Sequence, residues 1–211
     1  MDALERLHKS GIVPVVAIEN ADDAVPTAQA LLDGGIDVME ITYRTAAAPE
    51  CIRRVLEECP GMLVGAGTVI NKKQCEEAIA LGCKFIVSPG FDDEVVSLCI
   101  EKGVTVTPGC VTPTEIMRAL KYDLHVVKFF PAGVYGGMKA VKALAGPFGG
   151  NVKFIPTGGV SRYNLEEYIS SSYVHAVGGT WICRKEDIIN KQFSEITQRC
   201  VMARKAIEAH R

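Results

Sequence analysis

The chain has 211 residues, 48% of them hydrophobic, which is enough for a single domain with a substantial core. A net charge of −2 and a pI near 6.1, with no basic run longer than two residues, exclude a broad nucleic-acid-binding or anionic-membrane surface. The first ten residues carry four charges and so lack the apolar core of a signal peptide, and no apolar run is long enough to span a bilayer. The eight cysteines show no CxxC pair and no metal-ligand spacing, so we expect buried, reduced thiols in a cytoplasmic protein.

The predicted elements alternate between strands and helices along the whole chain. Residues 1–10 have leucines at helical spacing and stop at Ser10-Gly11, which predicts a short N-terminal helix. Apolar, β-favouring runs predict strands at 12–18, 36–42, 62–67, 84–88, 104–107, 125–130, 152–155 and 174–178. Helical periodicity predicts helices at 20–33, 49–59, 71–81, 92–102, 113–121, 135–144 and 162–170, followed by C-terminal helices.

Eight strand–helix units in a chain of this length predict a parallel sheet that closes on itself. The expected fold is therefore α/β, a (β/α)8 TIM barrel in which residues 1–211 form one domain and the N-terminal helix covers the bottom. An open doubly wound sheet is the alternative. Gly65 and Gly67 do not favour it, because no third glycine follows at the dinucleotide spacing and no acidic residue stands at the right distance.

A lone lysine, Lys128, interrupts the apolar run of the sixth predicted strand. Strand alternation gives it the inward parity of Val126 and Phe130, close to the C-terminal end of the strand. An enzyme with a barrel fold keeps an amine nucleophile at such a position, with Phe130 as a neighbouring substrate contact. The alternative is a surface lysine on an edge strand.

Three more strand ends carry candidate site residues. Glu40 has inward parity in the second strand, which suits proton transfer, although a structural ion pair with Lys128 or Arg44 is the alternative. Arg44 offers a planar fork for a substrate carboxylate, and Thr68 adds a hydroxyl after the third strand. Pro89 ends the fourth strand, either as a pocket wall or as a simple strand stop.

Glycine pairs follow the seventh and eighth strands, where barrels often hold phosphate. Gly158, Gly159 and Gly179 leave backbone N–H groups open to an anion, and Ser161 and Thr180 can add hydroxyl donors. A simple turn is the alternative for each pair, and a helix N-cap is the alternative for Ser161.

These residues together suit carbon–carbon bond cleavage through a Schiff base, with no metal or other cofactor. None of the four histidines stands at a strand end in company with other ligands. Two alternatives remain. One is a sugar-phosphate isomerase or epimerase that uses Glu40 and Lys128 as acid and base, and the other is a catalytically silent phosphosugar-binding protein.

Six motifs in register resemble the 2-keto-3-deoxy-6-phosphogluconate (KDPG) and 4-hydroxy-2-oxoglutarate (KHG) aldolases. They are residues 40–45 (EITYRT), 65–69 (GAGTV), 88–90 (SPG), 128–132 (KFFPA), 156–161 (PTGGVS) and 178–181 (GGTW). The resemblance implies a class I aldolase that cleaves KDPG to pyruvate and glyceraldehyde 3-phosphate, and KHG to pyruvate and glyoxylate. It also implies a cytoplasmic homotrimer in the Entner-Doudoroff pathway.

The resemblance also implies individual roles. By it, Lys128 forms the Schiff base, Glu40 is the general acid and base through a water, and Arg44 with Thr68 binds the pyruvate carboxylate. By the same resemblance, the phosphate is bound by backbone and hydroxyl donors: Gly158, Gly159, Ser161, Gly179 and Thr180. The chain departs from the family at Gly133, where members often carry glutamate, and at Thr180, where they often carry serine.

Overall fold

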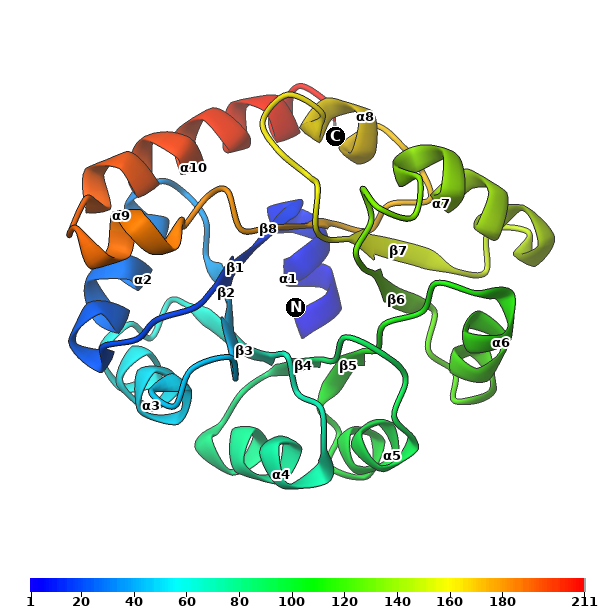
Figure 1. The fold of residues 1–211 in the computed structure, drawn as a ribbon, viewed down its shortest axis with the longest axis horizontal. Helices are drawn as coiled ribbons and strands as arrows, with labels where there is room; N and C mark the ends of the chain where they lie inside the picture. The colour runs from blue at the N-terminus through cyan, green and yellow to red at the C-terminus, as the bar shows by residue number, and fades with distance from the viewer. Residues whose placement is uncertain (211) are drawn as a thin grey trace.

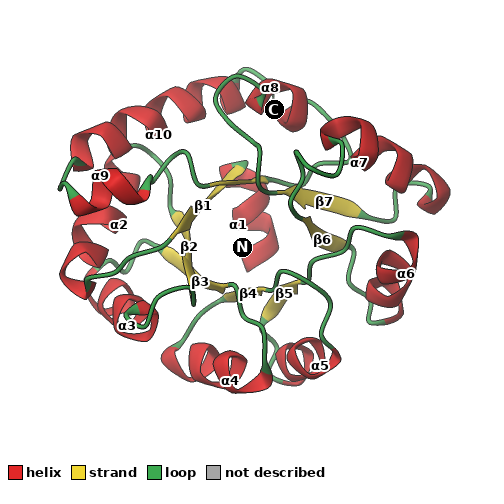
Figure 2. Ribbon diagram, viewed as in Figure 1, coloured by secondary structure: helices red, strands yellow, loops and turns green. Residues whose placement is uncertain are grey.

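The computed structural model describes residues 1–210. Its strands are β1 (Ile12–Val16), β2 (Val38–Thr42), β3 (Leu63–Gly67), β4 (Phe85–Val87), β5 (Thr105–Thr107), β6 (Val126–Phe129), β7 (Lys153–Pro156) and β8 (Val177–Gly179). Its helices are α1 (Ala3–Ser10), η1 (Ala21–Asp23), α2 (Ala24–Asp33), α3 (Ala48–Glu58), α4 (Lys72–Leu81), α5 (Asp93–Glu101), α6 (Pro113–Lys121), α7 (Gly137–Ala145), η2 (Gly146–Phe148), α8 (Leu165–Ile169), α9 (Lys185–Ile189) and α10 (Phe193–Glu208). Figures 1 and 2 show the strands around the centre of the molecule and the longer helices outside them.

The strands are parallel and lie in two hydrogen-bonded sheets. Six follow the order β5-β4-β3-β2-β1-β8, and β6 pairs with β7. Isolated parallel bridges join the sheets at Gly109–Lys128 and Thr157–Gly178, and the Lys128 N–H donates to the Pro108 carbonyl at 2.9 Å. Because consecutive strands are neighbours and the first strand pairs with the eighth, the doubly wound alternative is wrong.

Helix α1 lies against the N-terminal ends of the strands, as expected, and appears in the centre of Figure 1. Asp2 caps its first turn, and Gly11 ends it with φ 71°, where an added Cβ would lie 2.8 Å from a side-chain carbon of α10. The Arg6 guanidinium donates to the carbonyls of Asp37 (3.0 Å) and Gly61 (2.9 Å), which precede β2 and β3. The opposite ends of the strands are thus left for a site.

Several element boundaries differ from the sequence-based expectations because side chains take over backbone partners. The first strand ends at Val16 rather than residue 18, since the Ile18 carbonyl accepts the Thr45 hydroxyl at 2.6 Å and not a neighbouring strand. Helix α8 begins at Leu165 rather than residue 162, and the Asn164 side chain holds the preceding turn. Both differences lie at strand-to-helix loops, where local polar contacts compete with regular structure.

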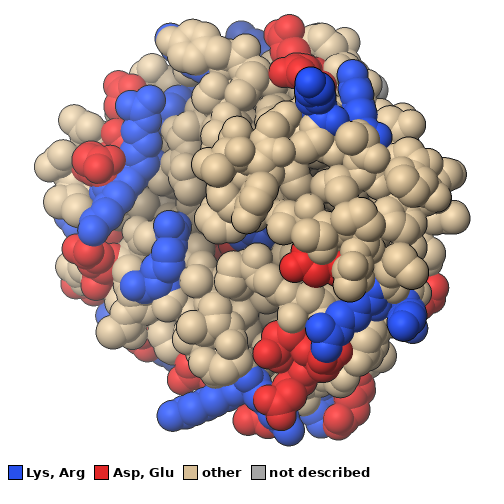
Figure 3. All heavy atoms as spheres, turned by 45° about the vertical axis from the view of Figure 1, so that its right-hand side comes forward, with Lys and Arg blue, Asp and Glu red and all other residues tan. Residues whose placement is uncertain are grey.

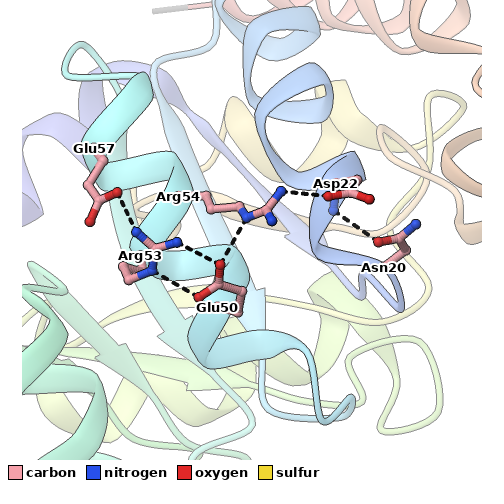
Figure 4. Close-up of polar contacts among 6 residues, drawn as sticks. All are labelled: Asn20, Asp22, Glu50, Arg53, Arg54 and Glu57. Atoms are coloured by element: carbon pink, nitrogen blue, oxygen red, sulfur yellow. Dashed lines mark hydrogen bonds and ion pairs between the residues drawn. The ribbon is translucent and has the colours of Figure 1, made fainter.

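An exposed ion-pair network ties α3 to η1 (Figure 4). Arg54 lies 2.7 Å from Asp22 and 2.9 Å from Glu50, while Arg53 contacts Glu50 at 2.6 Å and Glu57 at 2.5 Å. Hydrogen bonds from the two arginines lower the pKa of Glu50 to about 2. The network is on the outer, solvent-facing side of the scaffold, so it is structural.

The interior holds the thiols as well as the aliphatic and aromatic core. All eight cysteines are free and buried, and burial raises the pKa of Cys83, Cys110 and Cys200 to about 12. Most of these thiols are therefore inert packing groups. Within residues 1–210, no helix has the length and apolar character needed to cross a membrane.

Candidate active site

Lys128 on β6 and Glu40 on β2 meet inside the molecule, from strands on opposite sides of it (Figure 1). The Lys128 Nζ atom lies 3.6 Å from the Glu40 Oε1 atom, and the two side chains are only 6% and 4% exposed. The alternative of a surface lysine is wrong. Of the two ion pairs considered for Glu40, the one with Lys128 forms.

Strand register explains why the Glu40 carboxylate can reach this position. Glu40 pairs with Gly65 on β3, and Gly67, two residues further along, shares the same inward face. A Cβ on Gly67 would lie 2.0 Å from the Glu40 Oε1 atom, so the carboxylate occupies the space that a side chain would fill. Among the described residues, this buried oxygen has no hydrogen-bond partner. It is therefore available to a ligand or a water.

The carboxylate-binding candidates follow the strands that carry this pair. Arg44 lies just beyond β2, exposed, and its Nε–H donates to the Thr42 hydroxyl at 3.1 Å. Thr68 follows β3 half-buried, with φ 56°, a left-handed conformation that is uncommon for threonine and is often found at functional sites. Pro89 follows β4 and is exposed. All three follow the C-terminal ends of their strands, the same end of the molecule at which Lys128 and Glu40 lie.

Phe130 corrects one expectation. It lies beyond β6 rather than within the strand, and it is 39% exposed. Its ring centre is 5.3 Å from the Lys128 Nζ atom, so the aromatic face still covers the amine. Strand pairing stops at Phe129 because Pro131 has no N–H to donate.

The loops after β6 and β7 are joined through their backbones. The Ala132 N–H donates to the Thr157 carbonyl and the Gly133 N–H to the Gly158 carbonyl, both at 2.8 Å. Gly159 has φ 88°, and a Cβ on it would lie 2.9 Å from the Gly133 Cα atom. The close contact explains glycine at position 159, whereas a Cβ on Gly133 would lie 3.3 Å from the Gly159 Cα atom and 3.6 Å from the Gly158 carbonyl oxygen.

The remaining phosphate candidates are of two kinds, a buried backbone group and more accessible hydroxyl groups. Gly179 is buried at the end of β8, and Thr180 beyond it is exposed. Ser161 is half-buried, and its N–H donates to Asn164 at 2.7 Å. The alternative of Ser161 as the N-cap of α8 is wrong, because Asn164 holds that position.

Two pockets open beside these loops. One, of about 450 Å³, is lined among others by Val15, Arg44, Thr180, Trp181 and Arg184. The other, of about 270 Å³, is lined among others by Ser161, Trp181, Arg184 and Met202. The face in Figure 3 is largely uncharged over its central part, and most charged side chains gather toward its margins.

Three polar residues at these strand ends were missed by sequence reasoning. Thr157 and Thr107 are buried on the inward parity of Lys128, and a strict count of alternate residues along their strands would have found both. The Trp181 indole N–H is buried and has no partner among residues 1–210, a property that only coordinates reveal. No group of three or more described His, Cys, Asp or Glu side chains is placed to hold a metal ion.

Comparisons with known proteins identify the family. The family model for KDPG and KHG aldolase matches residues 4–199. A 2-dehydro-3-deoxy-phosphogluconate aldolase of Treponema pallidum is 45% identical, over 93% of this chain and 91% of that protein, and the KHG/KDPG aldolase of Escherichia coli K12 is 39% identical over the same shares. The KDPG aldolase of Legionella pneumophila, solved with pyruvate captured as a covalent carbinolamine, is 37% identical with a TM-score of 0.92, covering 96% of this chain and 98% of that one.

A buried lysine beside a carboxylate on a parallel α/β scaffold, with relatives of this kind, defines an aldolase, a carbon–carbon lyase. The chain belongs to the KDPG and KHG aldolase family. Membership favours the aldolase over an isomerase, an epimerase or a silent phosphosugar-binding protein.

Proposed function

We propose that this chain is a class I aldolase that cleaves KDPG to pyruvate and glyceraldehyde 3-phosphate, and KHG to pyruvate and glyoxylate. The buried contact between Lys128 and Glu40 is the observation that carries the proposal. It brings a nucleophilic amine within 3.6 Å of a group that can exchange protons, inside a water-poor interior. The carbinolamine in the Legionella enzyme supports the same chemistry.

The proposed reaction begins when the neutral amine of Lys128 attacks the keto carbon of the substrate. The carbinolamine loses water and gives an iminium, which withdraws electrons from the adjacent carbon–carbon bond. Glu40, through a water, takes the proton of the C4 hydroxyl as the C3–C4 bond breaks and the aldehyde leaves. The same carboxyl then returns a proton to C3 of the enamine, and hydrolysis of the iminium releases pyruvate and the free lysine.

The residues around Lys128 and Glu40 are proposed to bind the substrate. Arg44 and Thr68 are proposed to hold the pyruvate carboxylate, with Phe130 and Pro89 as pocket walls. The phosphate is assigned to Gly158, Gly159, Ser161, Gly179 and Thr180. The left-handed conformations of Gly158 and Gly159 support this assignment, since they turn backbone N–H groups away from regular pairing.

Trapping tests the covalent step directly. Borohydride added with pyruvate should leave a reduced pyruvyl group on Lys128, located by peptide mass spectrometry. Lys128→Met should remove both the adduct and cleavage, while Glu40→Gln should keep adduct formation and lose most of the cleavage, by roughly 100-fold or more. A wild-type protein that stays unmodified at saturating pyruvate contradicts the mechanism.

We also propose that the two sheets form one closed (β/α)8 barrel and that residues 1–211 make a single domain. The bridges at Gly109–Lys128 and Thr157–Gly178 support closure. Arg211 lies outside the described residues. Family resemblance supports a cytoplasmic homotrimer, which light scattering would test as three times the chain mass of 22.8 kDa.

A further inference from the structure

Arg184 stands at the wall between the two pockets beside the active site. It lines the 450 Å³ pocket together with Arg44 and Thr180, and it also lines the 270 Å³ pocket together with Ser161. Of the other lining residues, Trp181 alone also lines both pockets. Arg184 therefore shares one pocket lining with each of the two hydroxyls assigned to the phosphate, Thr180 and Ser161.

The backbone around Arg184 is firmly held. Its carbonyl accepts the N–H groups of Asp187 at 3.1 Å and Ile188 at 3.3 Å at the start of α9. Asp187 is buried in an ion pair with Arg199, and the Arg199 Nε–H donates to the Ile182 carbonyl at 3.1 Å. These contacts fix the segment that carries Arg184, so its side chain extends from an ordered base.

The Arg184 guanidinium is unpaired, in contrast to neighbouring cations. It makes no hydrogen bond or ion pair with any side chain of residues 1–210. By comparison, Lys185 is held by Glu19 at 2.7 Å, and the Arg162 guanidinium lies 4.5 Å from the ring centre of Tyr163. Arg184 is thus the cation of this wall that is free to meet a ligand.

The other groups at this wall also suit an anion. The acidic side chains that line the pockets are Glu186 and Glu195. Against them stand Arg184, Arg44, which donates to the Thr42 hydroxyl, and the ring-stacked Arg162, while Lys185 and Arg199 are already ion-paired. The buried indole N–H of Trp181 adds a neutral donor without a partner among the described residues. The summed charge of the side chains that line the two pockets is therefore positive, and the Trp181 N–H is an unpartnered donor in the same linings.

We propose that Arg184 is a specificity-determining residue that binds the phosphate dianion of the substrate and so favours phosphorylated over unphosphorylated 2-keto acids. The inference rests on the aldolase function proposed above. KHG ends in a carboxylate three carbons beyond its keto carbon, whereas KDPG carries a phosphate ester on its sixth carbon. In this proposal the guanidinium binds the phosphate on the sixth carbon, a group that KHG lacks, and its planar fork matches phosphate oxygens.

The test compares kcat/KM for KDPG and for KHG in wild type, Arg184→Met and Arg184→Lys. Arg184→Met should lower kcat/KM for KDPG about tenfold, mainly through KM, because an exposed charge-assisted contact is lost. The value for KHG should stay within about twofold. Arg184→Lys should keep part of the preference, since the charge remains and the fork is lost. Lys139→Met, which removes an exposed charge from α7, is the control and should leave both values unchanged.

Two results would overturn the inference. In one, Arg184→Met leaves the ratio of the two kcat/KM values at the wild-type level. In the other, the variant lowers both values equally, which indicates a general effect on the site. Borohydride trapping of pyruvate on Lys128 separates these results from failure of the proposed function, because the trapped adduct contains no phosphate and should form equally in wild type and Arg184→Met.

Discussion

Replacement of Gly67 by alanine tests whether the position of the Glu40 carboxylate determines the rate. The added Cβ would lie 2.0 Å from the Oε1 atom, where ordinary contacts begin at 3.4 Å, so the carboxylate has to move by about 1.4 Å. Gly67 does not have a left-handed φ, so alanine adds no backbone strain there. The variant should lose about 1–3 kcal/mol of stability through overpacking. Its kcat should fall about 100-fold, the usual cost of a 1 Å misplacement.

The assay pairs steady-state cleavage of KDPG with borohydride trapping of pyruvate and urea denaturation. Trapping on Lys128 should persist in Gly67→Ala, since the lysine itself is not displaced. Gly90→Ala is the matched control, because Gly90 lies just beyond β4, has no left-handed φ and has no atom within 4 Å of the place where a Cβ would stand. A folded Gly67→Ala protein with a kcat within about threefold of wild type would refute the reasoning.

Two further predictions concern stability. Thr107→Val removes a buried hydroxyl that has no partner among the described residues. Urea denaturation should therefore show an equal or higher free energy of unfolding, by up to about 1 kcal/mol. The control Thr27→Val removes a 2.7 Å hydrogen bond to the Asp23 carbonyl and should lower the free energy of unfolding by about 1 kcal/mol. The lowered pKa of Glu50 means that its ion pairs stabilise the fold above the unfolded-state pKa near 4.5 and are lost as the pH falls toward 2. Glu50→Gln should therefore lower the urea midpoint at pH 7 and leave it unchanged at pH 2, and equal effects at both pH values would contradict this.

The sequence predicted the number and order of the strand–helix units because their apolar periodicity and glycine ends are local signals. It also predicted the inward direction of Lys128 and Glu40, since strand alternation alone sets which face a side chain takes. It missed the start of α8 by three residues, because the turn before it depends on one side-chain contact of Asn164. Arg184 gave no signal, because a residue in a loop has no periodicity and its neighbours come from distant segments.

The pair at the centre of the site is explained by chemistry rather than by folding. Burying two charges costs free energy that mutual attraction recovers only when geometry and hydrogen bonding are complete. Here Lys128 and Glu40 are separated by 3.6 Å and the Glu40 oxygen lacks a hydrogen bond to any described residue, so the pair is incomplete. A hydrophobic pair would pack at least as well inside the sheet. The sheet supplies the stability to keep this pair, and Gly67 supplies the space, which leaves an amine and a carboxylate already placed for a substrate carbonyl.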